Sequence, residues 1–505
     1  MKVLLVNTNR MKPAIAPIGL DYLADAIAAA GHEPNLLDLC FSENVDGDIE
    51  AALRRFDPHV IGVSVRNTDD CYFSGGAFFL PEIKQIVTKL RSRSEAPIVL
   101  GGVGFSVAPE AVMDFVGADY GIAGPGERPF TSFLSALERG LGLETVPGLL
   151  YRANGVVRRN APEASETSDL PARRRALVDN GRYFREGGQA GFESKSGCSM
   201  NCIYCPEPHA KGRRIRLRLP DIVVEEIKTL LAQGVDHFHT CDSEFNIPAE
   251  HAKDVCRAII AAGLGGKIRW YAYCAVTPFD EETADLFRRA GGVGIDFGAD
   301  SGCDEILRRL GRHYTSEDIV NTARLCRRHR IVFMYDLLLG GPGETRDTVR
   351  RTIDLMRSVD ADCVGVAMGV RIYEGTPMAE LVRLQGDPAV NPALHGAKEG
   401  NPGFLKPVFY ISPELGDQIV AYLHEIVGGD ERFFLPSNEQ VASNYNYNEN
   451  TVLIDAIRAG ARGAYWDILR RLRAQAGPRS ERGRNHSENG GESASESPRR
   501  ASPPP

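Results

Sequence analysis

The sequence predicts an α/β protein: a Rossmann-like doubly wound parallel sheet, then a partial (β/α)6 TIM-like barrel, then a mainly helical C-terminal region. Short apolar runs alternate with amphipathic helical patterns over residues 1–140, and the alternation resumes over residues 190–375. Residues 376–475 lack a further repeat of this kind. A chain of 505 residues, 43% of them hydrophobic, is long enough for two or three domains with separate cores.

The first predicted domain, residues 1–140, carries polar and glycine-rich residues where its strands end. Alternating strands and helices imply a parallel sheet with right-handed crossovers, and such sheets bind ligands beyond the carboxyl ends of their strands. Ordinary strand-to-helix turns also use glycines, so this pattern alone is weak. The expected strands are 3–6, 35–38, 60–65, 97–100 and 120–123, and the expected helices are 18–30, 47–55, 80–92, 108–115 and 127–139. The candidate binding residues at this edge are Asn7, Ser64, Arg66, Gly101, Gly102, Gly124, Gly126 and Glu127.

Residues 141–189 are predicted to connect the two domains. A hairpin is expected around Ala153 and Asn154. The polar residues 162–168, which lead to Leu170 and Pro171, have the composition of a surface linker.

The second predicted domain, residues 190–375, contains six strand–helix units. Six units make a partial barrel, whose active site lies at the carboxyl ends of the strands. The expected strands are 190–196, 237–241, 268–274, 292–297, 331–339 and 363–370, with helices at 221–233, 248–262, 280–290, 315–328 and 346–357.

Three cysteines with C-x3-C-x2-C spacing, Cys198, Cys202 and Cys205, follow the first of these strands. Thiolates are soft ligands that suit zinc or an iron–sulfur cluster. Zinc sites use paired C-x2-C units or four protein ligands, and no second pair follows within the next few dozen residues. Three thiolates would leave the fourth iron of a [4Fe–4S] cluster open to a small molecule.

This loop, with Tyr204 before its last cysteine, resembles the signature of the radical S-adenosylmethionine (radical SAM) enzymes. The preceding domain resembles the cobalamin-binding domain of one large subgroup. The resemblance implies three cofactors: a [4Fe–4S] cluster on the three cysteines, S-adenosylmethionine on the open iron, and cobalamin at the edge of the first sheet. For any single acidic residue, a helix cap or a loop end is an equal alternative. The residues that the resemblance places near S-adenosylmethionine are Tyr204, Asp242, Ser243, Glu244, Asp300, Ser301, Gly340, Gly341 and Glu344.

Residues 57–62 spell D-x-H-x-x-G, the sequence that carries the cobalt-binding histidine in cobalamin mutases. There the histidine follows the first strand, whereas His59 opens the third strand at its amino edge. We therefore interpret His59 as structural, and expect cobalamin without a histidine on its lower face. Arg66, at the carboxyl end of that strand, is the better candidate there, with a capping or salt-bridging arginine as an equal alternative.

The implied cofactors limit the chemistry. A 5′-deoxyadenosyl radical can take hydrogen from carbon, and methylcobalamin can deliver a methyl group. The resemblance favours a C-methyltransferase that acts on a peptide or small-molecule biosynthetic intermediate, with tryptophan or another indole as one conceivable substrate. Flavodoxin or ferredoxin is the expected electron donor. The alternatives are a cyclase, rearranging or oxidising enzyme, a methylthiotransferase or other RNA-modifying enzyme, and a cobalamin or redox sensor without turnover.

Composition argues against several other classes. A formal net charge of −8 and a pI near 5.9 signal no basic face for nucleic acid. The N-terminus lacks the pattern of a signal peptide, and no apolar run reaches the roughly 18 residues that a membrane span needs. We expect a cytoplasmic enzyme. The other eight cysteines are expected to be small core residues, Cys71 and Cys241 included.

The C-terminal region, residues 376–475, is expected to form helices at 377–384, 412–427 and 451–475. Residues 444–448 interleave asparagine and tyrosine, which suits either a substrate pocket above the barrel or, as the plainer alternative, a packed corner. His209, His237, His239, Tyr271 and Tyr273 are further candidates to face the cavity, although alternation along a strand admits only half of them. Residues 476–505 are polar and rich in Ser, Arg, Glu, Gly and Pro, which predicts disorder.

Overall fold

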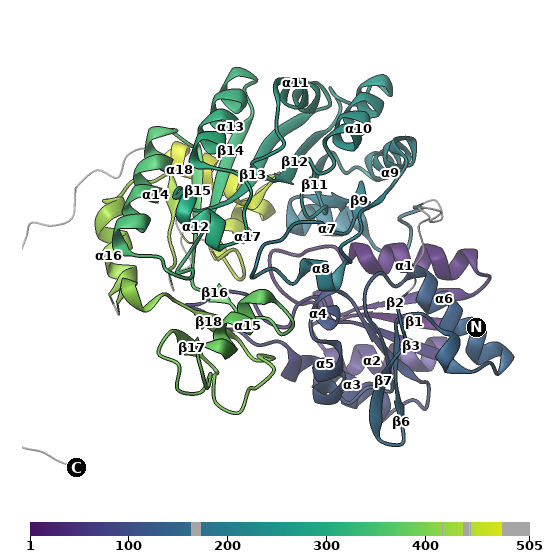
Figure 1. The fold of residues 1–505 in the computed structure, drawn as a ribbon. Coiled ribbons are helices and arrows are strands. Elements are labelled where there is room, and N and C mark those ends of the chain that lie inside the picture. The colour runs from purple at the N-terminus through teal and green to yellow at the C-terminus, as the bar shows by residue number, and fades with distance from the viewer. Residues whose placement is uncertain (163–172, 417, 438–443, 445, 477–505) are drawn as a thin grey trace, which may run out of the picture.

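The computed structural model describes residues 1–162, 173–416, 418–437, 444 and 446–476. Two α/β layers lie one above the other, with small C-terminal elements beside them (Figure 1). The polar linker at 163–168, Leu170, Pro171, Tyr445 and nearly all of the tail predicted to be disordered lie outside the described residues.

The N-terminal layer is a sheet in the order β2-β1-β3-β4-β5-β6-β7, counted over the described residues. The strands from β1 to β5 pair in parallel as predicted, so the strand order reverses between β1 and β3, which is where such sheets bind ligands. The hairpin expected in the connector adds to this sheet, since β6 pairs antiparallel with β5. The elements are β1 (Lys2–Asn7), α1 (Ile18–Ala29), β2 (Glu33–Asp38), η1 (Leu39–Phe41), α2 (Val45–Phe56), β3 (Val60–Ser64), α3 (Leu80–Arg91), β4 (Ile98–Gly101), α4 (Val103–Ser106), α5 (Pro109–Val116), β5 (Tyr120–Ile122), α6 (Glu127–Arg139), η2 (Leu143–Thr145), β6 (Leu149–Ala153) and β7 (Val156–Arg159).

The second layer is a parallel sheet whose strands follow the chain, β8-β11-β12-β13-β14-β15-β19. Helices cover one face, and the described strands at its two ends, β8 and β19, are not paired with each other, so the barrel is partial, as predicted. The elements are α7 (Asn180–Gly187), β8 (Ala190–Phe192), β9 (Lys195–Ser196), α8 (Glu207–Ala210), β10 (Arg216–Leu217), α9 (Pro220–Ala232), β11 (His237–Thr240), α10 (Ala249–Ala261), β12 (Arg269–Cys274), α11 (Glu281–Arg289), β13 (Gly292–Asp300), α12 (Asp304–Arg309), α13 (Ser316–Arg328), β14 (Val332–Leu339), α14 (Arg346–Ser358) and β15 (Cys363–Met368).

The strand expected at 190–196 is divided in the structure. β8 ends at Phe192, and β9 turns away to pair antiparallel with β10. The cause is Asp242, whose carboxylate accepts hydrogen bonds from the backbone N–H groups of Ser194 and Lys195 at 2.8 and 3.1 Å. Those N–H groups are therefore lost to the sheet, and the chain is directed into the cysteine loop.

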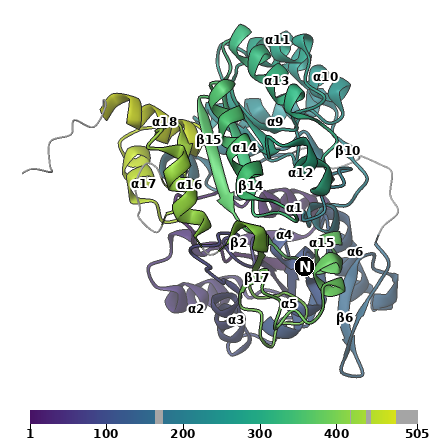
Figure 2. The ribbon, with the colours of Figure 1, turned by 60° about the vertical axis from the view of Figure 1, so that its left-hand side comes forward.

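The C-terminal region departs from the prediction in two ways. β19 pairs in parallel with β15, so the strand–helix repeat continues one strand further than expected. The helices predicted at 412–427 and 451–475 are each interrupted at glycines with positive φ, Gly416 and Gly460. Figure 2 shows α16, α17 and α18 gathered beside the second sheet. The elements are β16 (Val370–Arg371), α15 (Pro377–Leu384), β17 (Leu394–Gly396), β18 (Val408–Tyr410), η3 (Pro413–Leu415), α16 (Ile419–Val427), β19 (Phe433–Phe434), α17 (Thr451–Arg458) and α18 (Tyr465–Ala476).

A buried charge network joins the two layers. Arg175, from the connector, is fully buried and donates to Asp21 of α1 at 2.8 Å and to Glu226 of α9 at 2.7 Å. Arg218 binds the other oxygen of Glu226 at 2.6 Å. A second buried ion pair, Asp69 with Arg371 at 2.9 Å, links the loop after β3 to β16. These contacts hold the carboxyl edges of the two sheets against each other.

Candidate active site

A central cavity of about 930 Å³ lies between the carboxyl ends of the two sheets. One wall comes from the loops after β1 and β3, and the facing wall comes from the cysteine loop and the ends of β8, β11 and β12. Residues 446–448 and 464–466 complete it, so Asn446, Tyr447 and Asn448 take the pocket position that was one of the two sequence alternatives.

The three cysteines of the loop line this cavity. Burial raises the pKa of all three thiols, to about 11 for Cys202 and about 12 for Cys205. Among the described residues, no three His, Cys, Asp or Glu side chains are grouped as ligands of one metal ion. A [4Fe–4S] cluster does not need such a group, because each thiolate binds a different iron. Three thiols on one loop at the wall of a cavity therefore fit the cluster.

Of the residues predicted near S-adenosylmethionine, Tyr204, Asp242, Ser243 and Glu244 line the central cavity. The negative charge of the Glu244 carboxylate raises the pKa of Cys198 and of Cys202, so Glu244 lies close to the cysteine loop. Burial raises the pKa of Glu244 itself to about 7. Contact with S-adenosylmethionine stays a prediction for all of them.

The other five predicted residues do not line the cavity. The Ser301 hydroxyl is fully buried against Thr352, and the Glu344 carboxylate accepts hydrogen bonds from the N–H groups of Gly340 and Gly341. Asp300 accepts a hydrogen bond from the Tyr204 hydroxyl at 2.7 Å. These side chains shape the loops of the site, and direct contact with S-adenosylmethionine stays a prediction for them.

Arg312 is a site residue that the sequence analysis missed. Its guanidinium binds Asp300 at 2.6 Å and donates to the Tyr204 hydroxyl at 2.9 Å, while its Nη1 lies 3.9 Å from Glu244. It therefore ties the cysteine loop to the end of β13. Site residues were expected at strand ends, whereas Arg312 follows the helix α12.

A second pocket, of about 300 Å³, opens at the carboxyl edge of the first sheet, where the strand order reverses. Every residue predicted to bind cobalamin lines it. Gly102 has a φ of +100°, and a Cβ atom there would lie 2.6 Å from the backbone oxygen of Val65. Apolar side chains, among them Leu5, Leu20 and Phe130, extend the pocket as a slot between the sheet and its helices. Backbone turns beside an apolar slot of this volume fit one part of a large cofactor.

Arg66 lines both of these pockets and a third one. The Nη1 atom of Arg66 makes a long contact of 3.9 Å with the Met11 sulfur, and burial lowers the pKa of Arg66. Among the described residues no carboxylate forms an ion pair with it. The alternative of a salt-bridging arginine is therefore not what the structure has. His59 lies at the opposite edge, where its Nδ1 accepts a hydrogen bond from the Lys2 N–H at 2.8 Å, consistent with a structural role.

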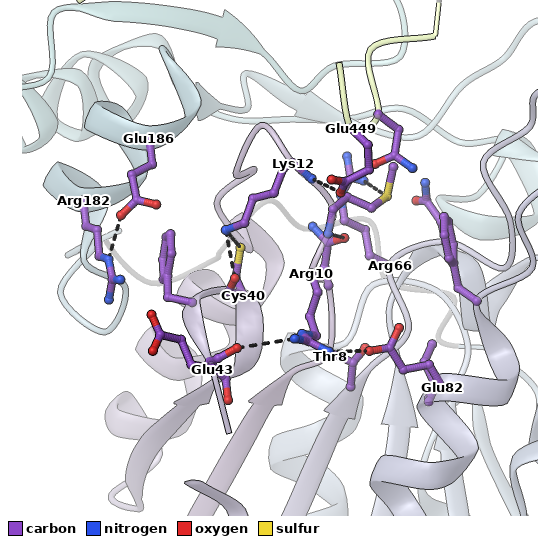
Figure 3. Close-up of a pocket in the computed structure, with 18 residues that line it drawn as sticks. Thr8, Arg10, Lys12, Cys40, Glu43, Arg66, Glu82, Arg182, Glu186 and Glu449 are labelled. Carbon is purple, nitrogen blue, oxygen red and sulfur yellow. Dashed lines mark hydrogen bonds and ion pairs between the residues drawn. The ribbon is translucent and has the colours of Figure 1, made fainter. Parts of the chain in front are cut away.

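The third pocket, of about 590 Å³, lies beside the loop after β1 and is lined by residues 8–12 and 40–43 among others (Figure 3). Arg10 pairs with Glu82 at 2.9 Å, and Arg182 pairs with Glu186 at 3.0 Å. Lys12 donates to the Cys40 carbonyl at 2.9 Å, so Arg10, Lys12 and Arg182 each have a polar partner at this pocket.

Comparison with known proteins agrees with this geometry. Residues 5–134 match the B12 binding domain and residues 193–356 match the radical SAM superfamily. A tryptophan 2-C-methyltransferase from Streptomyces laurentii is 31% identical over 92% of this chain and 95% of its own length. The chain belongs to the cobalamin-dependent radical SAM methyltransferases.

Solved structures extend this likeness to the whole fold. The radical SAM methyltransferase TsrM from Kitasatospora setae, solved with tryptophan and a SAM analogue, superposes with a TM-score of 0.86 at 32% identity over 94% of this chain and 99% of that one. TsrM with cobalamin and a [4Fe–4S] cluster gives 0.83 at 31% identity over 93% and 97%. The enzyme OxsB, at 18% identity and a TM-score of 0.70, shares the fold.

This chain is therefore a cobalamin-dependent radical SAM C-methyltransferase that uses a [4Fe–4S] cluster, S-adenosylmethionine and cobalamin. Together these cofactors supply a methyl group and the means to place it on carbon. The residues that line the two pockets would hold these cofactors at the edges of the two sheets and shield them from water. In the described part of the chain no helix is long and apolar enough to cross a membrane.

The expectation that the other cysteines are core residues was wrong for two of them. Cys71 and Cys241 line the central cavity and are not core residues. Of the further candidates, His239 and Tyr273 line the cavity, whereas Tyr271 is buried, with its hydroxyl 2.8 Å from Asp467. His209 and His237 are not part of its lining.

Proposed function

We propose that this methyltransferase acts on tryptophan and methylates carbon 2 of the indole ring. The observation that carries the proposal is similarity over nearly the whole chain to a tryptophan 2-C-methyltransferase and to a TsrM structure that contains tryptophan. The similarity covers 92–94% of this chain, and the proposal assigns substrate specificity to the C-terminal residues that complete the cavity.

The lining of the cavity supports an aromatic amino-acid substrate. Tyr273, Tyr447, Tyr465 and Trp466 provide aromatic surfaces, and the amides of Asn446 and Asn448 lie beside them. Aromatic faces favour a flat ring, and amide groups hydrogen-bond charged ammonium and carboxylate groups.

The proposal also assigns the binding of each cofactor and of the substrate to a segment of the chain. Residues 1–140 bind cobalamin, residues 190–375 bind the cluster and S-adenosylmethionine, and residues 376–475 complete the substrate pocket. A flavodoxin or ferredoxin is the proposed electron donor to the cluster.

The test is anaerobic reconstitution with iron, sulfide and cobalamin, followed by incubation with S-adenosylmethionine and L-tryptophan. Mass spectrometry should show a methylated tryptophan. Tryptophan deuterated at carbon 2 should lose its deuterium in the product, because that position is the one substituted. Consumption of S-adenosylmethionine with unmodified tryptophan, or a methylated product that retains the deuterium, would contradict the proposal.

A further inference from the structure

His239 is a partly buried histidine that lines the central cavity and that no cofactor assignment uses. It lies on β11, where Phe238 and Thr240 are buried and His239 is on the other face. Its Nδ1 lies 2.9 Å from the Thr240 carbonyl oxygen. Because a carbonyl oxygen can only accept, Nδ1 carries the proton in this hydrogen bond, and Nε2 keeps a free electron pair. Burial lowers the pKa of His239 to about 4, so the ring is neutral near pH 7.

Aromatic rings surround His239 on this wall. Its ring centroid lies 4.5 Å from that of Tyr273 and 6.4 Å from that of Tyr271, to which it is nearly parallel at 11°. Tyr273 has 45% of its surface exposed. Tyr271 in turn packs edge-on against Trp466. A flat substrate that lies against this wall would bring a ring edge close to the imidazole.

The carboxylates of the cavity are engaged elsewhere. Asp242 accepts three hydrogen bonds from Ser194 and Lys195. Glu207 pairs with Lys211 at 2.9 Å and accepts a hydrogen bond from Ser243 at 3.0 Å.

The two other carboxylates of the cavity, Glu244 and Asp70, lie on other parts of its lining. Glu244 lies beside the cysteine loop, as its effect on those thiols shows. Asp70 lies on the loop after β3 and accepts a hydrogen bond from the Tyr72 N–H at 3.1 Å. His239 is thus a neutral base within the aromatic wall.

We infer that His239 is a catalytic base, whose Nε2 takes the proton that leaves the methylated ring carbon. The inference rests on the proposed function, an aromatic carbon as methyl acceptor. The bond between the methyl group and its donor breaks with both electrons staying on the donor, and two π electrons of the ring form the new carbon–carbon bond. The C–H bond then breaks, its electron pair returns to the ring, and the proton passes to Nε2. The imidazolium later releases that proton to solvent.

The test compares His239→Gln with His237→Gln in the reconstituted holoenzyme. His237 lies on the same strand, two residues earlier, where it pairs with Asp236 at 2.7 Å outside the lining of the cavity. Glutamine keeps a donor for the Thr240 carbonyl and removes the base. Loss of a general base costs about 10²-fold to 10⁴-fold in rate. We expect at least the lower figure in kcat for His239→Gln, with KM and the cluster and cobalamin spectra near wild type, and little change for His237→Gln.

Deuterium at the methylated carbon separates catalysis from packing. In wild type the base should make proton loss faster than methyl transfer, so the deuterated substrate should react at the ordinary rate. In His239→Gln proton loss should limit turnover, so deuterium should slow the variant further. A His239→Gln enzyme as active as His237→Gln, or a slow one without an isotope effect, would overturn the role of His239. A wild type that leaves tryptophan unmethylated would instead overturn the proposed function, and this inference with it.

Discussion

The buried guanidinium of Arg175 is expected to hold the two layers of the enzyme together, and Arg175→Met tests this. Arg175 donates to Asp21, to Glu226, to Asn180 at 3.0 Å and to the Gly191 carbonyl at 2.9 Å. Methionine fills similar space without charge. Arg175 has a φ of +50°, and methionine would carry the same backbone strain, so the substitution isolates the loss of the ion pairs.

Removing one partner of a buried ion network leaves the other charges uncompensated, which costs about 3–5 kcal/mol. Unfolding entropy is about 2 cal/mol/K per residue, so a chain of 505 residues that melts as a unit loses roughly 1 °C per kcal/mol. We expect the melting temperature of Arg175→Met to fall by about 3–5 °C on these figures. Differential scanning calorimetry of the reconstituted enzyme measures it.

Arg152→Met is the matched control. Arg152 pairs with Asp114 at 2.7 Å, but the two side chains are 37% and 61% exposed. A surface pair of this kind contributes about 1 kcal/mol or less, so the melting temperature should change by about 1 °C at most. If Arg175→Met melts no lower than Arg152→Met, the argument that buried charges join the two layers is wrong.

Three further outcomes are expected. Cys202→Ala should abolish the visible absorbance of the cluster and S-adenosylmethionine turnover while cobalamin still binds, and retention of a full cluster signal would exclude this cysteine as a ligand. The pKa of Glu226 is lowered, because its two arginine partners outweigh the raising effect of burial. The stability it contributes is therefore present above the unfolded pKa of about 4.3 and lost as pH falls through the folded pKa, so acid unfolding followed by circular dichroism should depend less on pH in Glu226→Gln. Gly102→Ala would press a Cβ to 2.6 Å from the Val65 carbonyl oxygen at a positive φ; cobalamin retained after gel filtration should fall in Gly102→Ala and not in Gly117→Ala, a control outside the pocket that also has a positive φ and meets no atom within 4 Å.

Local pattern accounts for most of the architecture. The five strands and five helices expected in residues 1–140 all form, and the six strands expected in residues 190–375 are present. Period-2 and period-3.6 patterns are properties of adjacent residues, so they can be identified without tertiary contacts. The exception at 190–196 has a tertiary cause, since Asp242, more than 40 residues away, takes the N–H groups that the strand would have used.

The sequence by itself determined the cofactor chemistry of this enzyme. The spacing of Cys198, Cys202 and Cys205 is a local property, and the glycines at the carboxyl ends of the first sheet follow from strand order alone. Only the tertiary structure decided which polar side chains reach the cavity. Arg312, Cys71 and His239 come from different elements, and their positions depend on how the two layers meet. That contact is made by charges far apart in the chain, such as Asp21 with Arg175, whose pairing leaves no periodic signal in the sequence.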